Sequence, residues 1–431
     1  MPVLLDTSSA DFAAKFATFL AMKREVAADV EAASRRIVDD VASRGDLALL
    51  EATRKFDRLD LDAAHLRVGA DEIEQAAKAC DRETVAALEL ARDRIESFHR
   101  RQLPKDERFT DALGVELGWR WSAIESVGLY VPGGTAAYPS SVLMNAVPAK
   151  VAGVGRVVMV VPSPDGKLNP LVLAAANLAG VSEIYRVGGA QAVAALAYGT
   201  ATIAPVAKVV GPGNAYVAAA KRLVFGKVGI DMIAGPSEVL VIADHTANAA
   251  WIAADLLAQA EHDANAQSIL ITDDAGLAGD VARAVETQLS TLPRAEIARA
   301  SWQDFGSIIQ VRAIDESVGL ADALAAEHLE IMTADPEALA AKIRNAGAMF
   351  LGSHTPEAIG DYVGGSNHVL PTARSARFSS GLGVLDFMKR TSMLKCGPDQ
   401  LRALGPAAMT LGKAEGLDAH SRSVGIRLNL P

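Results

Sequence analysis

From about Gly118 to Gly352, the chain alternates short runs of β-branched residues with alanine-rich helical segments, and this alternation constrains its fold most. Strands that are separated by helices need crossover connections, which predict right-handed βαβ units and parallel sheets. The predicted strands are Val157–Val161, Glu183–Val187, Lys208–Val210, Val239–Ala243, Ser268–Thr272, Ser307–Val311, Leu329–Thr333 and Ala348–Leu351. They are too many for one sheet, and a break near Asp231–Ser237 divides them into two sets. We therefore predict an α/β protein with two Rossmann-like domains, each built on a parallel sheet.

The sequence changes character on both sides of this alternating region. From Asp11 to about Arg101 the pattern is nearly all helical, and after His354 a region rich in Gly, Ser and Pro leads to a C-terminal tail. We expect a helical N-terminal arm (residues 1–23) and an extended C-terminal arm (residues 376–431). Between them we expect one α/β domain from residues 24–105 plus 237–375, and a second from residues 106–236.

Composition excludes several classes of protein. With 431 residues, half of them hydrophobic, the chain should form folded domains and more than one core. Cys80 and Cys396 lie far apart in no spaced motif, which argues against a disulfide framework and a thiolate metal site. The formal net charge of −10 disfavours nucleic-acid binding. The longest apolar run, Val151–Pro162, is short and contains Arg156, so no membrane span is predicted. Because no charged-then-apolar leader opens the chain, we expect a cytoplasmic protein that acts on small molecules.

Three glycine-rich turns follow strands in the first half of the alternating region: Tyr130–Ser141, Gly188–Gln191 and Gly211–Asn214. Glycine lets a backbone approach a ligand closely, and the helix that follows offers free N–H groups to an anion. None of the turns has the G-x-G-x-x-G spacing of a dinucleotide fingerprint. Each alone is more typical of ordinary α/β structure, but together they could hold a nucleotide beyond the strand ends.

Gln259 and His262 lie three residues apart at the end of a helical run, so they share one face of that helix. An amide oxygen beside an imidazole suits a divalent metal that keeps positions open for substrate. The alternative is a solvated polar helix end. Upstream, Ser237 belongs to the polar turn that opens onto the next predicted strand.

Carboxylates stand beside histidines at three further places: Glu327 with His328, Asp361 with His368, and Glu415 with His420. A carboxylate base and an imidazole that titrates near neutrality suit proton transfer, whereas the alternative for Glu327 and His328 is two solvated chain ends. The remaining histidines lack such a setting and are expected at the surface or at helix caps: His65, His99, His245 and His354. A mixed nitrogen and oxygen ligand set suited to zinc would come from Gln259, His262, Asp361 and His420.

Several longer motifs resemble the histidinol dehydrogenase family over essentially the whole length of the chain. The matching segments are Tyr130-Val-Pro-Gly-Gly, Val210-Gly-Pro-Gly-Asn-Ala-Tyr-Val217, Ile230-Asp-x-x-Ala-Gly-Pro-Ser-Glu238, Gln259-Ala-Glu-His262, Glu327-His-Leu329, Gly360-Asp-Tyr-Val-Gly-Gly-x-x-His368-x-Leu-Pro-Thr372 and Glu415-Gly-Leu-x-x-His420. The resemblance implies oxidation of L-histidinol to L-histidine through histidinal, with two NAD and water, in the last steps of histidine biosynthesis.

The resemblance also implies a role for each matching residue. It implies Glu327 and His328 as the acid–base residues, and NAD contacts from Tyr130, Gln191 and Asn214. Zinc ligands would be Gln259, His262, Asp361 and His420. The substrate would be surrounded by Ser237, Gln259, His262, His328, Asp361, His368, Glu415 and His420. Residues 106–236 would be the NAD-binding domain, and residues 24–105 plus 237–375 the catalytic and metal-binding domain.

For residues 376–431 the resemblance implies a dimerisation arm that carries Glu415 and His420 to the partner's site in a homodimer. The sequence alone leaves open a tail that folds back on its own chain. Two other activities also stay open. One is a zinc and NAD dehydrogenase of another polar alcohol, such as a sulfonated diol, although Ser237, His368 and Glu415 favour histidinol. The other is a zinc hydrolase in which Glu327 activates a metal-bound water and the glycine turns bind no nucleotide.

Overall fold

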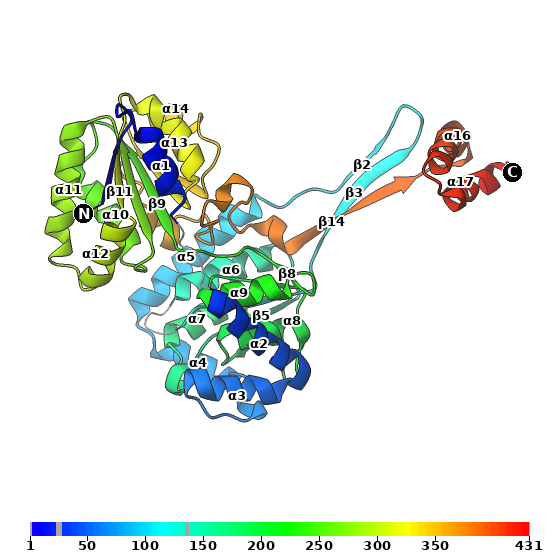
Figure 1. Ribbon diagram of the computed structural model, residues 1–431. Coiled ribbons are helices and arrows are strands. Elements are labelled where there is room, and N and C mark those ends of the chain that lie inside the picture. Colours follow the sequence, from blue (N-terminus) through cyan, green and yellow to red (C-terminus); the bar gives the residue numbers. More distant parts are fainter. Residues whose placement is uncertain (1, 23–27, 134–137, 431) are drawn as a thin grey trace.

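The computed structural model describes residues 2–22, 28–133 and 138–430. Figure 1 shows two α/β lobes and an arm that extends away from them. One lobe is built on a five-stranded parallel sheet with the order β6-β5-β4-β7-β8. Its strands are β4 (Ser126–Tyr130), β5 (Arg156–Val160), β6 (Glu183–Tyr185), β7 (Lys208–Val210) and β8 (Gly229–Ile230).

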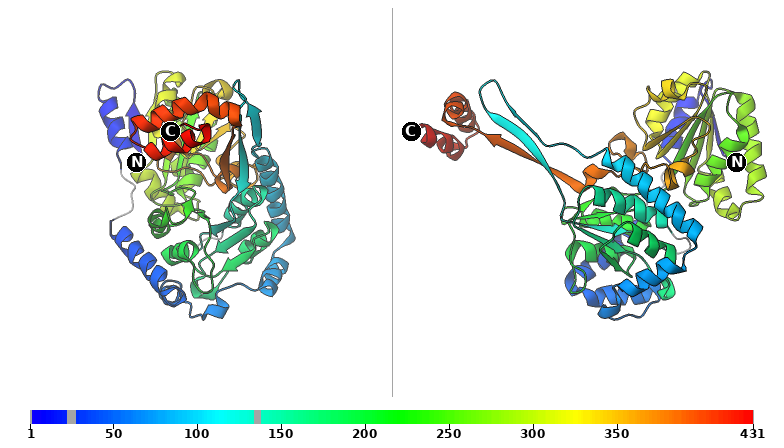
Figure 2. Two further views of the ribbon diagram at one scale, coloured as in Figure 1. Left: turned by 90° about the vertical axis from the view of Figure 1, so that its right-hand side faces the viewer. Right: turned by 180° about the vertical axis from the view of Figure 1, so that it is seen from behind.

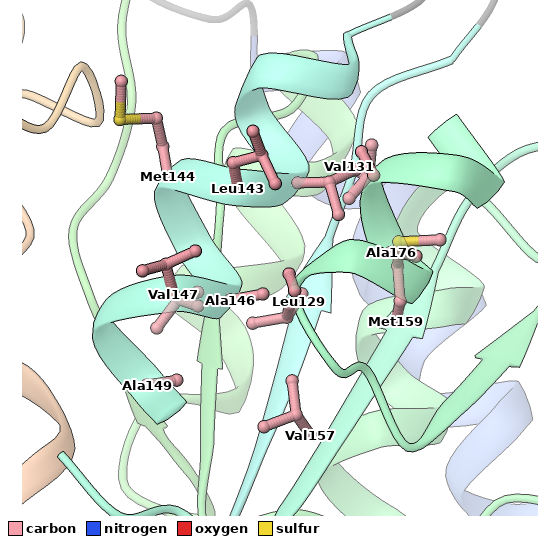
Figure 3. Close-up of a cluster of buried hydrophobic side chains, with 14 of the residues drawn as sticks. Leu129, Val131, Leu143, Met144, Ala146, Val147, Ala149, Val157, Met159 and Ala176 are labelled. Carbon is pink, nitrogen blue, oxygen red and sulfur yellow. The ribbon is translucent and has the colours of Figure 1, made fainter. Parts of the chain in front are cut away.

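Helices cover both faces of this sheet, which explains its near-continuous runs of apolar residues. One face packs against α4 (Ala70–Ala79), α5 (Arg82–Arg100), α6 (Pro139–Val151) and α7 (Pro170–Leu178). The other packs against α2 (Ala28–Arg44), α3 (Asp46–Asp57), α8 (Gly189–Tyr198) and α9 (Ala215–Val224). Figure 3 shows part of the first core, where Ala146 of α6 lies beside Leu129 of β4.

The packing of the N-terminal helices differs from our expectation for residues 24–105. We expected this segment to join residues 237–375, but α2 to α5 pack on the five-stranded sheet instead. The helical pattern predicts an apolar face on each helix, yet nothing in that pattern says which sheet covers it. Residues 23–27 lie outside the described residues.

The second lobe is built on a six-stranded parallel sheet with the order β1-β11-β10-β9-β12-β13. Its strands are β1 (Val3–Asp6), β9 (Glu238–Ala243), β10 (Gln267–Thr272), β11 (Ser307–Gln310), β12 (His328–Met332) and β13 (Ala348–Leu351). One face carries α10 (Ala249–Ala260), α11 (Ala275–Leu289) and α12 (Ala295–Asp304), and the other carries α1 (Phe12–Leu20), α13 (Ser317–Leu324) and α14 (Pro336–Ala340). As the sequence predicted, the strands on either side of Asp231–Ser237 belong to different sheets.

The first residues of the chain do not form the separate helical arm that we expected for residues 1–23. Residues 3–6 form the edge strand β1, which pairs in parallel with β11, and Leu5 is buried. The helix α1 follows, and its Phe16 and Phe19 pack into the core of the six-stranded lobe. The N-terminal segment, as far as it is described, is therefore part of that lobe.

The arm combines two segments that are far apart in sequence. Its antiparallel sheet joins β14 (Met388–Lys395) to β3 (Glu116–Ala123), and β3 to β2 (Glu107–Thr110). The helices α16 (Pro398–Ala414) and α17 (Asp418–Gly425) follow β14 and lie at the tip of the arm (Figure 1, and Figure 2, right). Residues 107–123, which we expected in the domain of residues 106–236, thus contribute to the arm. No helix in the described ranges is both long and apolar enough to cross a membrane.

Candidate active site

The strand order of the five-stranded sheet reverses between β4 and β7, next to Tyr130 and Gly211. The chain builds β4 first, adds β5 and β6 on one side, and then adds β7 and β8 on the other. Ligands of open α/β sheets bind beyond the carboxyl ends of the strands where the order reverses, which here are β4 and β7. Tyr130 ends β4, and Gly211 directly follows β7.

The residues predicted to contact NAD lie on the elements around this point. The phenol oxygen of Tyr130 accepts the N–H of Gly189 at 3.0 Å, and burial raises the pKa of Tyr130 to about 12, so its hydroxyl stays protonated. Gln191 is buried in α8. Asn214 is exposed and caps α9, where its Oδ1 accepts two backbone N–H groups at 3.1 and 3.2 Å. Residues 134–137 of the first glycine turn lie outside the described residues.

Glu327 and His328 lie together at the amino end of β12, next to the start of β9. The Glu327 Oε2 atom accepts the backbone N–H of Glu238 at 3.0 Å. The His328 Nδ1 atom lies 3.2 Å from the Glu238 carbonyl oxygen and 3.6 Å from Glu357 Oε2. On the other side of the ring, Nε2 lies 3.5 Å from Asp361 Oδ1. Glu238, Glu327, His328 and Glu357 are buried, and Asp361 is half-buried.

The electrostatics of the pair suit proton transfer. Burial raises the pKa of Glu327 to about 7, although the charge of His328 and the N–H of Glu238 act to lower it. Burial opposes the charge on His328, but the carboxylates of Glu357 and Glu327 outweigh it and raise the pKa of His328 well above its usual value. A carboxylate that titrates near neutrality beside an imidazole that holds a proton is typical of acid–base sites.

Beneath His328 lies a group of buried carboxyl groups that the sequence analysis missed. Glu330 Oε1 accepts the backbone N–H of Glu357 at 2.7 Å, and the Glu330 side chain is hydrogen bonded to Asp255. Burial is the main cause that raises the pKa of Asp255 to about 6, of Glu357 to about 8 and of Glu330 to about 9. Glu330 could have been found, because a glutamate inside a strand predicted to be buried on both faces is unusual.

Gln259 shows the clearest sign of an unfilled ligand role. It is fully buried near the end of α10, and neither its Oε1 nor its Nε2 atom has a hydrogen-bond partner. A buried amide without partners is unfavourable unless another group satisfies it. His262 follows on the next turn, and its backbone N–H donates to the Gln259 carbonyl at 3.2 Å.

His262 and Asp361 interact electrostatically across the same site. Desolvation of the imidazole lowers the pKa of His262, whereas the charge of Asp361 acts to raise it. His262 as a whole residue is exposed at the surface. Burial would raise the pKa of Asp361, but the hydrogen bond and charge of His328 outweigh it, so the pKa is lowered. Within the described ranges, no three His, Cys, Asp or Glu side chains gather as a metal site. A metal here would therefore depend on Gln259 and on a ligand from elsewhere.

Two other predicted residues line the region between the lobes. The Nδ1 atom of His368 lies 2.9 Å from the Asp361 carbonyl oxygen. Its Nε2 atom lies 3.3 Å from the Oγ atom of Ser141, which is near the start of α6 in the five-stranded lobe. Burial lowers the pKa of His368, which favours its neutral form. Ser237 is half-buried and directly precedes β9.

Glu415 and His420 do not join these residues within one chain. Glu415 caps the end of α16 and His420 lies in α17, and both are exposed. Figures 1 and 2 show these helices at the tip of the arm, away from the six-stranded sheet. Within one chain, His262 and Asp361 thus interact electrostatically and Gln259 lies one helical turn before His262, whereas His420 lies on the arm.

Comparison with known proteins identifies the family. Residues 20–428 match the histidinol dehydrogenase family model. The sequence is 83% identical to histidinol dehydrogenase of Bradyrhizobium diazoefficiens and 82% identical to that of Rhodopseudomonas palustris, in each case over 100% of both chains. The crystal structure of histidinol dehydrogenase from Elizabethkingia anophelis matches with a TM-score of 0.94 and 36% identity, covering 99% of this chain and 98% of that one. The chain belongs to the histidinol dehydrogenase family.

Proposed function

We propose that this protein oxidises L-histidinol to L-histidine through histidinal, and that it uses two NAD and one water. Family membership supports the substrate, and the observation that carries the chemistry is the buried pair of Glu327 and His328, whose Nε2 atom lies 3.5 Å from Asp361 Oδ1. The first oxidation removes two electrons from the alcohol carbon. The second adds a water oxygen and removes two more, which gives the carboxylate.

The residues fit a zinc ion. Gln259 offers a buried amide without partners, His262 offers an imidazole whose lowered pKa keeps it neutral, and Asp361 offers a carboxylate kept ionised by its lowered pKa. Bound zinc would hold the imidazole and amino nitrogens of histidinol and so orient the carbon that is oxidised. Bound NAD, near Tyr130, Gln191 and Asn214, would accept the electrons and hydrogen that leave that carbon.

His328 and Glu327 divide the proton transfers between them. The Nδ1 atom of His328 faces the Glu238 carbonyl and Glu357, so Nε2 is the atom that exchanges a proton with the substrate. Because the neighbouring carboxylates raise the pKa of His328, the first oxidation requires its neutral form. In that form Nδ1 keeps its proton towards the Glu238 carbonyl oxygen, and Nε2 takes the proton of the alcohol. In the second oxidation, Glu327 takes a proton from the water that attacks the aldehyde, and His328 again accepts a proton. A pKa of about 7 keeps a fraction of Glu327 ionised at neutral pH for this task.

We also propose a homodimer in which each arm completes the site of the partner. Glu415 and His420 lie at the tip of the arm and away from the other proposed ligands. The arm exposes large apolar side chains that would be covered in a dimer: Phe109, Leu113, Leu394, Leu404, Leu411, Leu417 and Ile426. The incomplete ligand set and the uncovered apolar surface both support exchange of arms.

An assay of NADH absorbance with histidinol and NAD tests the proposed activity. We expect two NADH for each histidinol consumed, and loss of turnover after chelation while circular dichroism stays unchanged, because Gln259, His262 and Asp361 lie on the lobes rather than on the arm. His262→Asn should resemble the chelated enzyme in metal content and activity. If NADH forms only with another polar alcohol, such as a sulfonated diol, that alcohol replaces histidinol as the proposed substrate. Hydrolase activity without NADH formation, or full activity without metal, would refute the assignment.

A further inference from the structure

A deeply buried ion pair beyond the carboxyl ends of β7 and β8 joins Lys221 of α9 to Asp231, which directly follows β8. Their side chains are only 2% and 1% exposed. Lys221 Nζ contacts Asp231 Oδ1 and also donates to the Gly211 carbonyl oxygen at 2.9 Å. The N–H of Gly211 donates to Asp231 Oδ2 at 2.7 Å. The two ends of one ion pair therefore hold both polar backbone groups of Gly211.

Gly211 occupies a position where only glycine fits. Its φ is +109°, and a Cβ atom built there would lie 2.2 Å from the carbonyl oxygen of Tyr130. The loop that begins at Gly211 leads to Asn214, which caps α9. The ion pair thus fixes where residues 211–214 lie relative to the end of β4.

Asp231 also begins the segment that crosses from one sheet to the other. Within residues 231–238, the Gly235 N–H donates to Thr372 Oγ1 at 2.6 Å. At the far end, the Glu238 N–H donates to Glu327 at 3.0 Å, and the Glu238 carbonyl oxygen lies 3.2 Å from His328 Nδ1. A single short segment therefore connects the Gly211 loop to the acid–base pair.

Stability alone does not account for this ion pair. Removing two charges from water is unfavourable, and an apolar pair of similar volume is often as stable as a buried ion pair. An apolar pair, however, would leave the buried N–H and C=O of Gly211 without partners. We propose that Lys221 and Asp231 are positioning residues for NAD: they fix residues 211–214 against the dinucleotide and, through residues 231–238, align it with Glu327 and His328. This inference rests on the proposed use of NAD.

The test compares paired substitutions in the full-length protein. Lys221→Met with Asp231→Leu removes the charges and keeps the volume. We expect the KM for NAD and the calorimetric Kd for NADH to rise at least about tenfold, because two backbone hydrogen bonds are lost. Zinc content and histidinol affinity should stay within about twofold of wild type, because the substrate ligands are untouched. Lys221→Gln with Asp231→Asn keeps a donor and an acceptor for Gly211 and should recover most of the NADH affinity.

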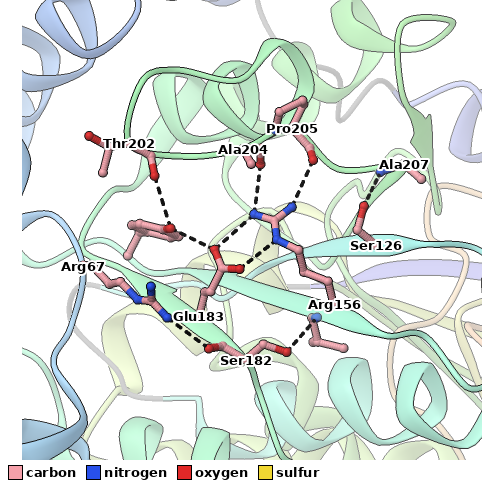
Figure 4. Close-up of polar contacts among 11 residues, drawn as sticks. Arg67, Ser126, Arg156, Ser182, Glu183, Thr202, Ala204, Pro205 and Ala207 are labelled. Atoms are coloured by element: carbon pink, nitrogen blue, oxygen red, sulfur yellow. Dashed lines mark hydrogen bonds and ion pairs between the residues drawn. The ribbon is translucent and has the colours of Figure 1, made fainter.

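A matched control pair lies at the opposite end of the same sheet. Arg156 and Glu183 form an ion pair at the amino ends of β5 and β6, where Arg156 also donates to the carbonyl groups of Ala204 and Pro205 (Figure 4). Arg156→Met with Glu183→Leu should lower the melting temperature and leave NADH affinity unchanged. This outcome would separate general loss of stability from loss of positioning.

The outcomes distinguish failure of the inference from failure of the proposed function. Wild-type protein that neither binds NADH nor oxidises histidinol would refute the proposed function. The positioning role is wrong if wild type is active and the folded variant Lys221→Met with Asp231→Leu binds NADH as tightly as wild type does. If that variant does not fold, Gly211→Ala is the second test. It keeps both charges, but its Cβ atom would push residues 211–214 away from the Tyr130 carbonyl oxygen. Wild-type NADH affinity in folded Gly211→Ala would overturn the inference, and weakened affinity would support it.

Discussion

At the scale of single residues, the proposed roles of Glu327 and His328 can be separated, because only the second oxidation consumes water. Glu327→Gln keeps an oxygen that can accept the Glu238 N–H, but it cannot take a proton. We expect histidinal oxidation to fall about 10²–10⁴-fold, as is typical when a general base is removed, and alcohol oxidation to fall far less. NADH formation from supplied histidinal measures the second step directly. Glu337→Gln, at an exposed position, is the control, and equal losses in both steps would contradict this role.

Glu330 should make the stability of the protein depend on pH. Burial, followed by the charges of Asp255 and Glu357, raises the pKa of Glu330 from 4.5 to about 9. The folded state therefore holds this proton more tightly than the unfolded state, so stability falls as pH rises from 4.5 towards 9. The free energy of unfolding should therefore fall between pH 6 and pH 9.

Glu330→Gln removes this titration and keeps an acceptor for the Glu357 N–H. We expect the variant to be more stable than wild type at pH 9, with a smaller difference at pH 6. Urea unfolding at the two pH values measures the free energy of unfolding of both proteins. Parallel pH dependence in the two proteins would show that Glu330 ionises as readily in the folded state as in the unfolded one.

The sequence could predict residues whose partners are close in the chain, but not those that the fold brings together. Gln259 and His262 share one helical face, and Glu327 and His328 are adjacent. By contrast, the Asp255, Glu330 and Glu357 side chains come from α10, β12 and α15 (Glu357–Tyr362). His99 was expected at the surface or at a cap, but it is fully buried and its Nδ1 lies 2.8 Å from the Ile95 carbonyl oxygen. Its helical spacing with the buried Leu88, Ala91 and Ile95 was the signal for burial.

At the scale of elements, apolar strands were largely predictable, whereas exposed polar strands were not. The eight predicted strands occur with ends shifted by at most two residues, and most of their residues are buried. The buried central strand β4 was not among the eight. All residues of β2 are exposed and most of β14 is, so neither shows an apolar pattern. The edge strand β1 depends on pairing with β11, about 300 residues later in the chain, which no local pattern reveals.

The N-terminal helix should contribute measurably to the six-stranded lobe. Phe19 of α1 is 2% exposed and packs among core residues. We expect Phe19→Ala to lower the free energy of unfolding by about 3–5 kcal/mol, because it removes a buried ring and leaves a cavity. Phe225→Ala, at a position that is 67% exposed, should change it little. Urea denaturation of both variants is the measurement, and equal small effects would place α1 outside the cooperative core.

At the scale of the whole molecule, the two sheets present opposite edges to the proposed reaction. The five-stranded sheet offers the carboxyl ends of its strands, at Tyr130 and Gly211, whereas the six-stranded sheet offers the amino ends of β9 and β12. The rule that ligands bind beyond the carboxyl ends of parallel strands applies to the five-stranded lobe only. The second can differ because α10 returns Gln259 to the amino edge of its sheet, next to the segment that crosses between the lobes.

The ownership of each arm can be tested by mixing two inactive variants, Gln259→Ala and His420→Ala. If arms cross between subunits, a mixed dimer contains one site with both lesions and one with neither. Random re-pairing of equal amounts should then restore about a quarter of wild-type activity. The measurement is NADH formation after subunit exchange, with exchange verified by mass spectrometry of differently tagged chains. Each variant exchanged with itself is the control and should remain inactive. Absence of recovery after verified exchange would mean that each chain folds its own arm back and supplies His420 to its own site.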